Sequence, residues 1–283
     1  MTRSDAWIGR EEQRTDVIGP EAAQRWLATL DRDAPGDDTL PQAFHWCLCL
    51  PDAPSASLGA DGHPLRDDSP NSFLPPLPDL PRRMWASSAV EFLAPLKIGD
   101  AIVRTSQVLA VTEKNGSSGR LVFVEVQHET ATEAGLAVRE VQSLVYRAPA
   151  APGTPPAPPP LGSARFDPAS WTAHRTITPN EALLFRFSAL TFNSHRIHYD
   201  LPYARDEENY RGLVVHGPLT ATLLLDLAQR QLGDNAAARF SFKGLSPAIA
   251  GEPLHLVMRP GEGGHEMAAF ADDGRQIVAA RVA

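Results

Sequence analysis

Side chains that can transfer protons gather in one stretch of this 283-residue chain. The stretch reads Leu-Thr-Phe-Asn-Ser-His-Arg-Ile-His-Tyr-Asp over residues 190–200 and leads to His216-Gly217-Pro218. An imidazole with its ordinary pKa of about 6.5 can take up and release a proton at neutral pH. Asn193 cannot accept a proton, but its amide can accept and donate hydrogen bonds. Unless these groups are purely structural, the stretch predicts a site of proton transfer.

The same stretch leads into a predicted buried helix between Gly217 and Gly233. Pro218 suits the first helical position, and Gly233 suits the cap at the far end. Apolar residues occupy most faces of this helix, which predicts that it is buried. The first N–H group of a helix has no intrahelical partner and lies at the positive end of the helix dipole. The backbone N–H of Gly217 is therefore a candidate hydrogen-bond donor to a ligand.

A proline-rich segment divides the chain. Residues 148–162 contain seven prolines in fifteen positions, which favours a semi-rigid, extended spacer over a helix or a central strand. Each half then supplies runs of β-type residues joined by short turns, a pattern typical of antiparallel sheets. The expected strands are residues 101–111, 120–130 and 136–147 in the first half, and residues 238–245, 253–259, 266–271 and 276–282 in the second.

The two halves resemble each other. The segment that begins at Pro20 has a counterpart at Pro179, and Pro95-Leu-Lys-Ile-Gly-Asp has a counterpart in Pro247-Ala-Ile-Ala-Gly-Glu. The matches occur in the same order at similar separations, which indicates an internal repeat. A counterpart of the buried helix is hard to find in the first half, because residues 42–63 contain prolines and a glycine. We expect that helix to be short or remodelled.

The histidine-rich stretch resembles the hydratase motif of the MaoC-like (R)-specific enoyl-CoA hydratases and dehydratases. The positions that fit the motif in place are Ile197, His198, Asp200, Ala204, His216 and Gly217. Three positions depart from it: Asn193 replaces the catalytic Asp, His195 replaces Asn, and Arg196 replaces Pro. With these departures the chain is more similar to one subgroup, the mitochondrial-type hydroxyacyl-thioester dehydratases and the mesaconyl-CoA and itaconyl-CoA hydratases. Residues 62–66, 73–76 and 81–86 extend the resemblance into the first half.

This resemblance implies an α+β double hotdog, with two antiparallel sheets that each surround a helix and join edge to edge. Residues 1–147 would form a catalytically degenerate hotdog, and residues 163–283 the catalytic one. Asp33, the counterpart of Asn193, has no histidine five residues later, which agrees with an inactive first half. The implied activity is that of a hydro-lyase, which interconverts a 2-enoyl thioester and a 3-hydroxyacyl thioester; mesaconyl-CoA and itaconyl-CoA are candidate substrates.

The resemblance also implies the roles of particular residues. His198 would act as general acid and base, Asn193 would hold the water, and the Gly217 N–H would bind the thioester oxygen. Candidate substrate-binding residues are Arg196, His195, His216, Asp200, Arg82 and Arg83. Arg196 could hold a substrate carboxylate or pair with a nearby acid, and Arg82 and Arg83 could meet coenzyme A phosphates or remain solvated. Asp200 is expected to orient the loop or a histidine, and His216 is expected to position Gly217. The remaining histidines, among them His45 and His63, show no readable pattern.

Three other interpretations remain open on the sequence alone. A thioesterase shares the hotdog fold, although it normally directs an acidic residue at the carbonyl. A metal site could use His195, His198 and Asp200, because two histidines and a carboxylate can bind zinc. A non-catalytic acyl-thioester binding protein would explain the missing Asp. Our first hypothesis is the hydratase, with no metal.

The composition excludes several classes of partner. A net charge of −8, from 26 basic and 34 acidic residues, argues against nucleic acid, which requires a basic surface. No apolar run long enough to span a membrane occurs, and the N-terminal residues resemble no targeting signal. We therefore expect a cytoplasmic enzyme without a cofactor, apart from the coenzyme A or acyl carrier protein of its substrate. Cys47 and Cys49 are expected to be reduced and packed. A homodimer remains a possibility, but no residue in the sequence indicates one.

Overall fold

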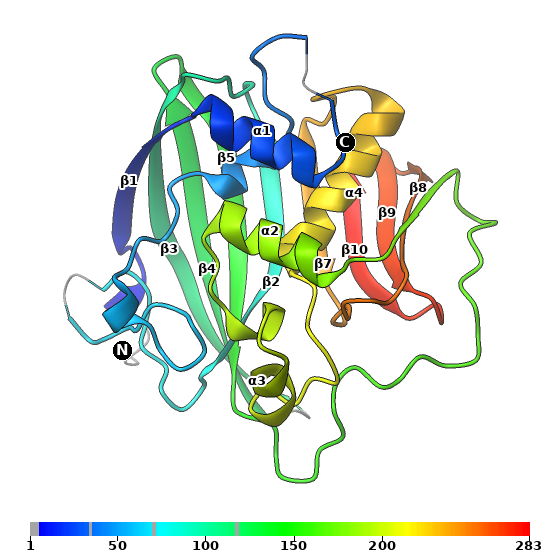
Figure 1. The fold of residues 1–283 in the computed structure, drawn as a ribbon. Coiled ribbons are helices and arrows are strands. Elements are labelled where there is room, and N and C mark those ends of the chain that lie inside the picture. The colour runs from blue at the N-terminus through cyan, green and yellow to red at the C-terminus, as the bar shows by residue number, and fades with distance from the viewer. Residues whose placement is uncertain (1–5, 34–35, 70–71, 117–118) are drawn as a thin grey trace.

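One antiparallel sheet of ten strands runs through the molecule (Figure 1). The computed structural model describes residues 6–33, 36–69, 72–116 and 119–283. Across the sheet the strand order is β1-β3-β4-β5-β2-β7-β10-β9-β8-β6. The strands are β1 (Glu11–Val17), β2 (Arg82–Phe92), β3 (Ala101–Gly116), β4 (Gly119–Thr132), β5 (Gly135–Arg147), β6 (Ala173–Ile177), β7 (Arg239–Gly244), β8 (Leu254–Gly261), β9 (Gly264–Ala271) and β10 (Gln276–Val282).

The strand order is the same in both halves. The first half follows β1-β3-β4-β5-β2, and the second half follows β6-β8-β9-β10-β7, read from the outer edge inwards. The halves join where β2 pairs with β7, from Ser87 opposite Lys243 to Glu91 opposite Arg239. Each half thus has one five-stranded sheet, and the two sheets meet edge to edge. The predicted α+β double hotdog is confirmed.

The helices lie together on one face of this sheet (Figure 1). Helices α1 (Pro20–Thr29) and α2 (Glu181–Thr191) follow the first strand of their halves, as the sequence repeat predicts. The Asn180 side chain begins α2 by accepting a hydrogen bond from the Leu183 N–H at 2.9 Å. The predicted central helix is α4 (Gly217–Leu232), and its residues from Leu219 to Gln229 are buried. In the first half only two 3₁₀ turns, η2 (Phe44–Cys47) and η3 (Ser55–Ser57), stand between α1 and β2 among the described residues, so the expected remodelling is confirmed.

A buried carboxylate ties α4 to both halves. Asp226 is 2% exposed, and it pairs with Arg32 at 3.1 Å, with Arg230 at 2.8 Å and with Arg175. Arg32 follows α1, Arg230 lies on α4 and Arg175 lies on β6. Three cations around one carboxylate therefore hold three separate elements against one another.

The proline-rich segment is docked rather than a free spacer. Ala157 pairs with Tyr210 in an isolated bridge, and the backbone N–H of Arg211 donates to the Ala157 carbonyl at 3.0 Å. The Arg211 side chain also donates to the Pro158 carbonyl at 3.0 Å. The segment contains no helix or named strand, and these long-range bonds attach it to the loop beside the site. No helix in the described ranges combines the length and apolar character needed to cross a membrane.

Candidate active site

A cavity of about 1300 Å³ is lined by residues of both halves. The second half contributes Asn193, His195, His198, His216 and Gly217 to its wall. The first half contributes, among others, His63, Arg66 and Arg83. The histidine-rich stretch and the start of α4 therefore face one shared space, in which a ligand could contact both.

His198 is buried with one ring nitrogen already occupied. The residue is 7% exposed, and its Nδ1 lies 2.7 Å from the Val214 carbonyl oxygen. Because a carbonyl can only accept, Nδ1 carries the hydrogen and Nε2 keeps its lone pair. Burial, together with the nearby His195, lowers the pKa of His198 to about 3. The ring is therefore a neutral base at physiological pH, although its ordinary pKa would have left it partly charged.

His216 connects His198 to the start of α4. The two rings stack with their centroids 3.6 Å apart, and Nε2 of His216 lies 2.9 Å from the Ser188 hydroxyl. Burial lowers the pKa of His216 well below its ordinary value, so both stacked rings are neutral. His216 is the N-cap residue of α4, and Gly217 is the first residue of that helix. The stack thus sets His198 beside the helix end that carries unpaired N–H groups.

Asn193 lies at the entrance to the loop that carries His195. Its Oδ1 accepts a hydrogen bond from the backbone N–H of His195 at 3.0 Å. This contact identifies the oxygen of the amide, since a backbone N–H needs an acceptor. The amide NH2 group of Asn193 donates no hydrogen bond to any described residue. That group is available as a donor to something in the cavity.

His195 and Arg82 share a buried glutamate. The Nε2 of His195 lies 3.8 Å from Glu208, and the other oxygen of Glu208 accepts a hydrogen bond from Arg82 at 2.5 Å. The Arg82 guanidinium also lies 5.1 Å from the ring centroid of Tyr210. Arg82 is not among the described residues that line the cavity. The expected contact of Arg82 with coenzyme A phosphates is therefore corrected, because this side chain is committed to Glu208.

Arg196 and Asp200 pair with each other outside the cavity wall. Arg196 contacts Asp200 at 2.7 Å and donates to the Ala60 carbonyl at 2.9 Å. Asp200 accepts a hydrogen bond from the Tyr203 N–H at 3.1 Å, which caps α3 (Leu201–Asp206). Neither residue is among the described lining residues. Their assignment as substrate-binding residues is corrected: this pair orients the loop.

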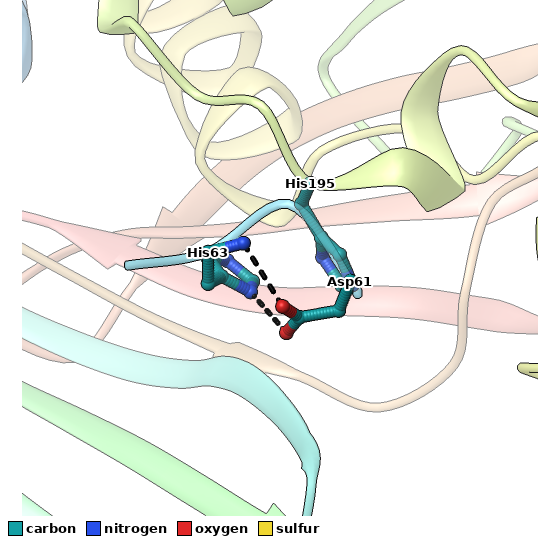
Figure 2. Close-up of side chains that lie close together, drawn as sticks. All are labelled: Asp61, His63 and His195. Carbon is teal, nitrogen blue, oxygen red and sulfur yellow. Dashed lines mark hydrogen bonds and ion pairs between the residues drawn. The ribbon is translucent and has the colours of Figure 1, made fainter. Parts of the chain in front are cut away.

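The first half supplies a hydrogen-bonded pair that the sequence analysis overlooked. Nδ1 of His63 lies 2.7 Å from Asp61, and the His63 ring centroid lies 4.3 Å from that of His195 (Figure 2). Burial opposes ionisation of Asp61, but the hydrogen bond from His63 lowers the pKa of this carboxyl to about 2. The available signal was the Asp61-Gly62-His63 spacing, which overlaps the start of a segment that carries the family resemblance.

A glycine allows this pair to approach the catalytic loop. Gly62 has φ of +89°, and a Cβ built on it would lie 2.0 Å from the Ser194 carbonyl oxygen. The Ser194 hydroxyl donates to the Gly62 carbonyl at 2.5 Å, and the Arg196 N–H donates to the Asp61 carbonyl at 2.9 Å. The turn at 60–63 is therefore locked onto the loop at 194–196.

The alternative metal site is not assembled as its sequence pattern suggested. Asp200 is paired with Arg196, and the Nδ1 of His198 faces Val214. A different set, Asp61, His63 and His195, has ligand atoms within 4.8 Å of one another (Figure 2). Within that set, the 2.7 Å contact between Asp61 and His63 has the length of a hydrogen bond.

Comparisons with known proteins agree with this geometry. The fold is that of solved MaoC-like dehydratases. More particularly, the chain belongs to the hydroxyacyl-thioester dehydratase type 2 family, whose model matches residues 43–250. The predicted class of enzyme, a hydro-lyase acting on acyl thioesters, is confirmed by this membership.

Individual relatives give the same result. The chain is 43% identical to a mesaconyl-C4-CoA hydratase of Chloroflexus aurantiacus, over 98% of this chain and 96% of that one. It is 27% identical to a mitochondrial hydroxyacyl-thioester dehydratase type 2 of Schizosaccharomyces pombe, over 78% of each chain. A solved MaoC-like dehydratase from Phytophthora capsici shares the fold, with a TM-score of 0.69, 15% identity and coverage of 97% of this chain and 95% of that one. The predicted relationship to the MaoC-like superfamily is confirmed.

Proposed function

We propose that this protein catalyses the reversible hydration of a short 2-enoyl-CoA that carries a free carboxylate, as mesaconyl-CoA does. The observation that carries the proposal is the neutral, buried His198, whose Nε2 is unprotonated, in the same cavity as the first residue of α4. The relative named mesaconyl-C4-CoA hydratase, matched along almost the whole chain, supports the choice of acyl group.

A single imidazole is sufficient for this reaction. As the water oxygen bonds to Cβ, Nε2 of His198 takes a proton from that water. The imidazolium then gives the proton to Cα. One O–H bond and the π bond between Cα and Cβ break, one C–O bond and one C–H bond form, and the ring returns to its neutral state. A residue that starts neutral and ends neutral suits a reaction with no net proton change.

The start of α4 stabilises the charge that develops on the thioester oxygen. The N–H of Gly217 would donate to this oxygen as the enolate forms, and losing one such donor costs about 3–4 kcal/mol in acyl-transfer enzymes. The free NH2 group of Asn193 would donate to the water oxygen and aim it at Cβ. His216 and His195 would position His198 by packing against its ring.

The proposal assigns different tasks to the two halves. Residues 163–283 carry the proton transfer, while residues 1–147 supply wall residues for the acyl group, and residues 148–162 connect them. No cofactor is consumed beyond the coenzyme A or acyl carrier protein of the substrate. One chain supplies the cavity described here, so the proposed site does not require a homodimer. We assign the protein to the cytoplasm, where the buried, unpaired thiols of Cys47 and Cys49 would stay reduced.

An assay of enoyl-CoA substrates tests the proposal. The wild-type protein is offered mesaconyl-CoA, itaconyl-CoA, crotonyl-CoA and a long-chain enoyl-CoA, and both loss of the conjugated double bond and release of free thiol are recorded. We expect saturable loss of the double bond with mesaconyl-CoA and no thiol release. Thiol release without hydration would contradict the proposal and support a thioesterase.

A further inference from the structure

Arg83 is a charged side chain on the cavity wall without a partner. It is half-buried in β2, and no hydrogen bond or ion pair to its guanidinium occurs in the described part of the chain. Two other arginines of the wall have their own partners: Arg14 pairs with Glu12 at 3.0 Å, and Arg104 donates to two backbone carbonyls. Burying a charge is costly unless the charge is paired. An anionic ligand that paired with the free guanidinium of Arg83 would therefore remove this cost.

A second guanidinium strengthens the positive charge here. Arg66 lines the same cavity, and its one hydrogen-bond acceptor among the described residues is the neutral hydroxyl of Tyr146, whose ring lies 5.3 Å from the guanidinium. Burial lowers the pKa of Arg66 and of Arg83 to about 10, so both are cations at neutral pH. The carboxylate whose charge acts on both is Asp61, and it is hydrogen-bonded to His63. The two guanidinium groups therefore have a single nearby carboxylate, Asp61, and that carboxylate already accepts a hydrogen bond from His63.

Arg83 lies on the part of β2 that runs beside the start of α4. A Cβ on Gly217 would lie 3.7 Å from the carbonyl oxygen of Trp85, so β2 passes directly beside the start of α4. Arg83 precedes Trp85 by two residues, which is about 7 Å along a strand. Its charge also acts on His63, whose ring contacts His195. The phosphates of coenzyme A are separated from the thioester by the whole pantetheine arm.

We propose that Arg83, assisted by Arg66, binds the free carboxylate of a dicarboxylic enoyl-CoA and so selects this substrate class. In mesaconyl-C4-CoA the free carboxylate is attached to the carbon that receives the hydroxyl group, three bonds from the thioester carbon. That short separation agrees with a carboxylate-binding residue on the part of β2 that passes beside Gly217 at Trp85. A guanidinium can hold both carboxylate oxygens through parallel N–H donors. The assignment rests on the proposed function and replaces the expected contact of Arg83 with phosphates.

Substrate pairs that differ only in the carboxylate test this subsite. 3-Methylcrotonyl-CoA has a methyl group where mesaconyl-C4-CoA has its carboxylate. Dissociation constants for both are measured in the His198→Gln background, where turnover is slowed, with Arg83 intact, with Arg83→Met and with Arg83→Lys. Arg25→Met, on the exposed face of α1, controls for removal of a surface charge. Thermal unfolding is recorded for each variant.

We expect Arg83→Met to weaken mesaconyl-C4-CoA binding by about 10- to 100-fold, the usual worth of a charged hydrogen-bonded contact. Binding of 3-methylcrotonyl-CoA should stay within about threefold, and Arg83→Lys should recover part of the loss. Equal weakening of both ligands, or of neither, would overturn the subsite. If the wild-type enzyme binds mesaconyl-C4-CoA selectively through Arg83 but hydrates none of the enoyl-CoA panel, the proposed reaction fails and the subsite stands.

Discussion

The neighbours of His198 keep its ring neutral. They are the imidazoles of His195 and His216 and the carbonyl of Val214, and no carboxylate is bonded to the ring among the described residues. Burial and the nearby His195 both favour the uncharged form. A neutral ring with its hydrogen fixed on Nδ1 offers one lone pair to the cavity. The absence of an acid at position 193 removes a group that would otherwise raise the pKa of this histidine.

The pH dependence of catalysis should reveal this state. A base works only when unprotonated, and the pKa of His198 in the folded enzyme is about 3. The value of kcat/KM should therefore stay level from pH 8 down to pH 5 and fall only as the pH approaches this pKa. Steady-state kinetics in constant-ionic-strength buffers measures the profile. A decline centred on about pH 6.5, the ordinary pKa of a histidine, would show that the ring titrates freely.

Side-chain roles could be predicted only where their partners are close in sequence. Residues 193, 195, 198 and 217 all line the cavity, as the motif implied. Arg196 and Asp200 are four residues apart and pair with each other, a contact that the spacing itself could have suggested. Arg82 finds Glu208 across the domain boundary, and local sequence gives no indication of that pair.

At the scale of elements, the turn at 60–63 is the feature that completes the site. It brings His63 against His195, more than a hundred positions later in the chain. Neither periodicity nor spacing predicts such a contact, because it depends on how the two halves dock. The close approach of the Gly62 backbone to the Ser194 carbonyl is what makes the docking possible.

A Gly62→Ala substitution should open this turn. The new Cβ would meet the Ser194 carbonyl at 2.0 Å, and backbone oxygen cannot yield as a flexible side chain can. We expect a loss of at least about 2 kcal/mol in unfolding free energy and a fall in kcat/KM, measured by urea denaturation and by enoyl-CoA assay. Gly251→Ala is the matched control, because Gly251 has φ of +84° with nothing within 4 Å of the added Cβ. The free energy of unfolding of that variant should fall by only about 1 kcal/mol, because of backbone strain. Equal behaviour of the two variants would contradict the docking.

At the scale of the whole molecule, the repeat in the sequence predicted the symmetry of the sheet. The matched segments that begin at Pro20 and Pro179 contain α1 and α2. Those that begin at Pro95 and Pro247 directly precede β3 and β8. The strand that joins the halves, β2, was not expected, since Arg82-Arg-Met-Trp-Ala-Ser-Ser shows no regular alternation. Its conformation is fixed by pairing with β5 on one side and β7 on the other, which a single sequence does not reveal.

The carboxylate of Asp226 should stabilise the joined halves. Asp226→Asn removes the charge that balances Arg32, Arg175 and Arg230, and it leaves these cations without their buried anion. We expect the free energy of unfolding to fall by about 3 kcal/mol in urea denaturation. Glu113→Gln, which breaks an exposed pair with Arg120, should leave it nearly unchanged. Loss of the same size in both variants would argue that Asp226 contributes no more than a surface pair.

The most direct test of the central claim is the kcat of His198→Gln for mesaconyl-CoA hydration. Glutamine can still donate a hydrogen bond to the Val214 carbonyl but cannot take a proton from water. His174→Ala, at an exposed histidine on β6, is the control, and thermal unfolding verifies that each variant is folded. We predict that kcat falls by about 10² to 10⁴ in His198→Gln and is unchanged in the control. A folded His198→Gln enzyme that hydrates mesaconyl-CoA at the wild-type rate would contradict the account.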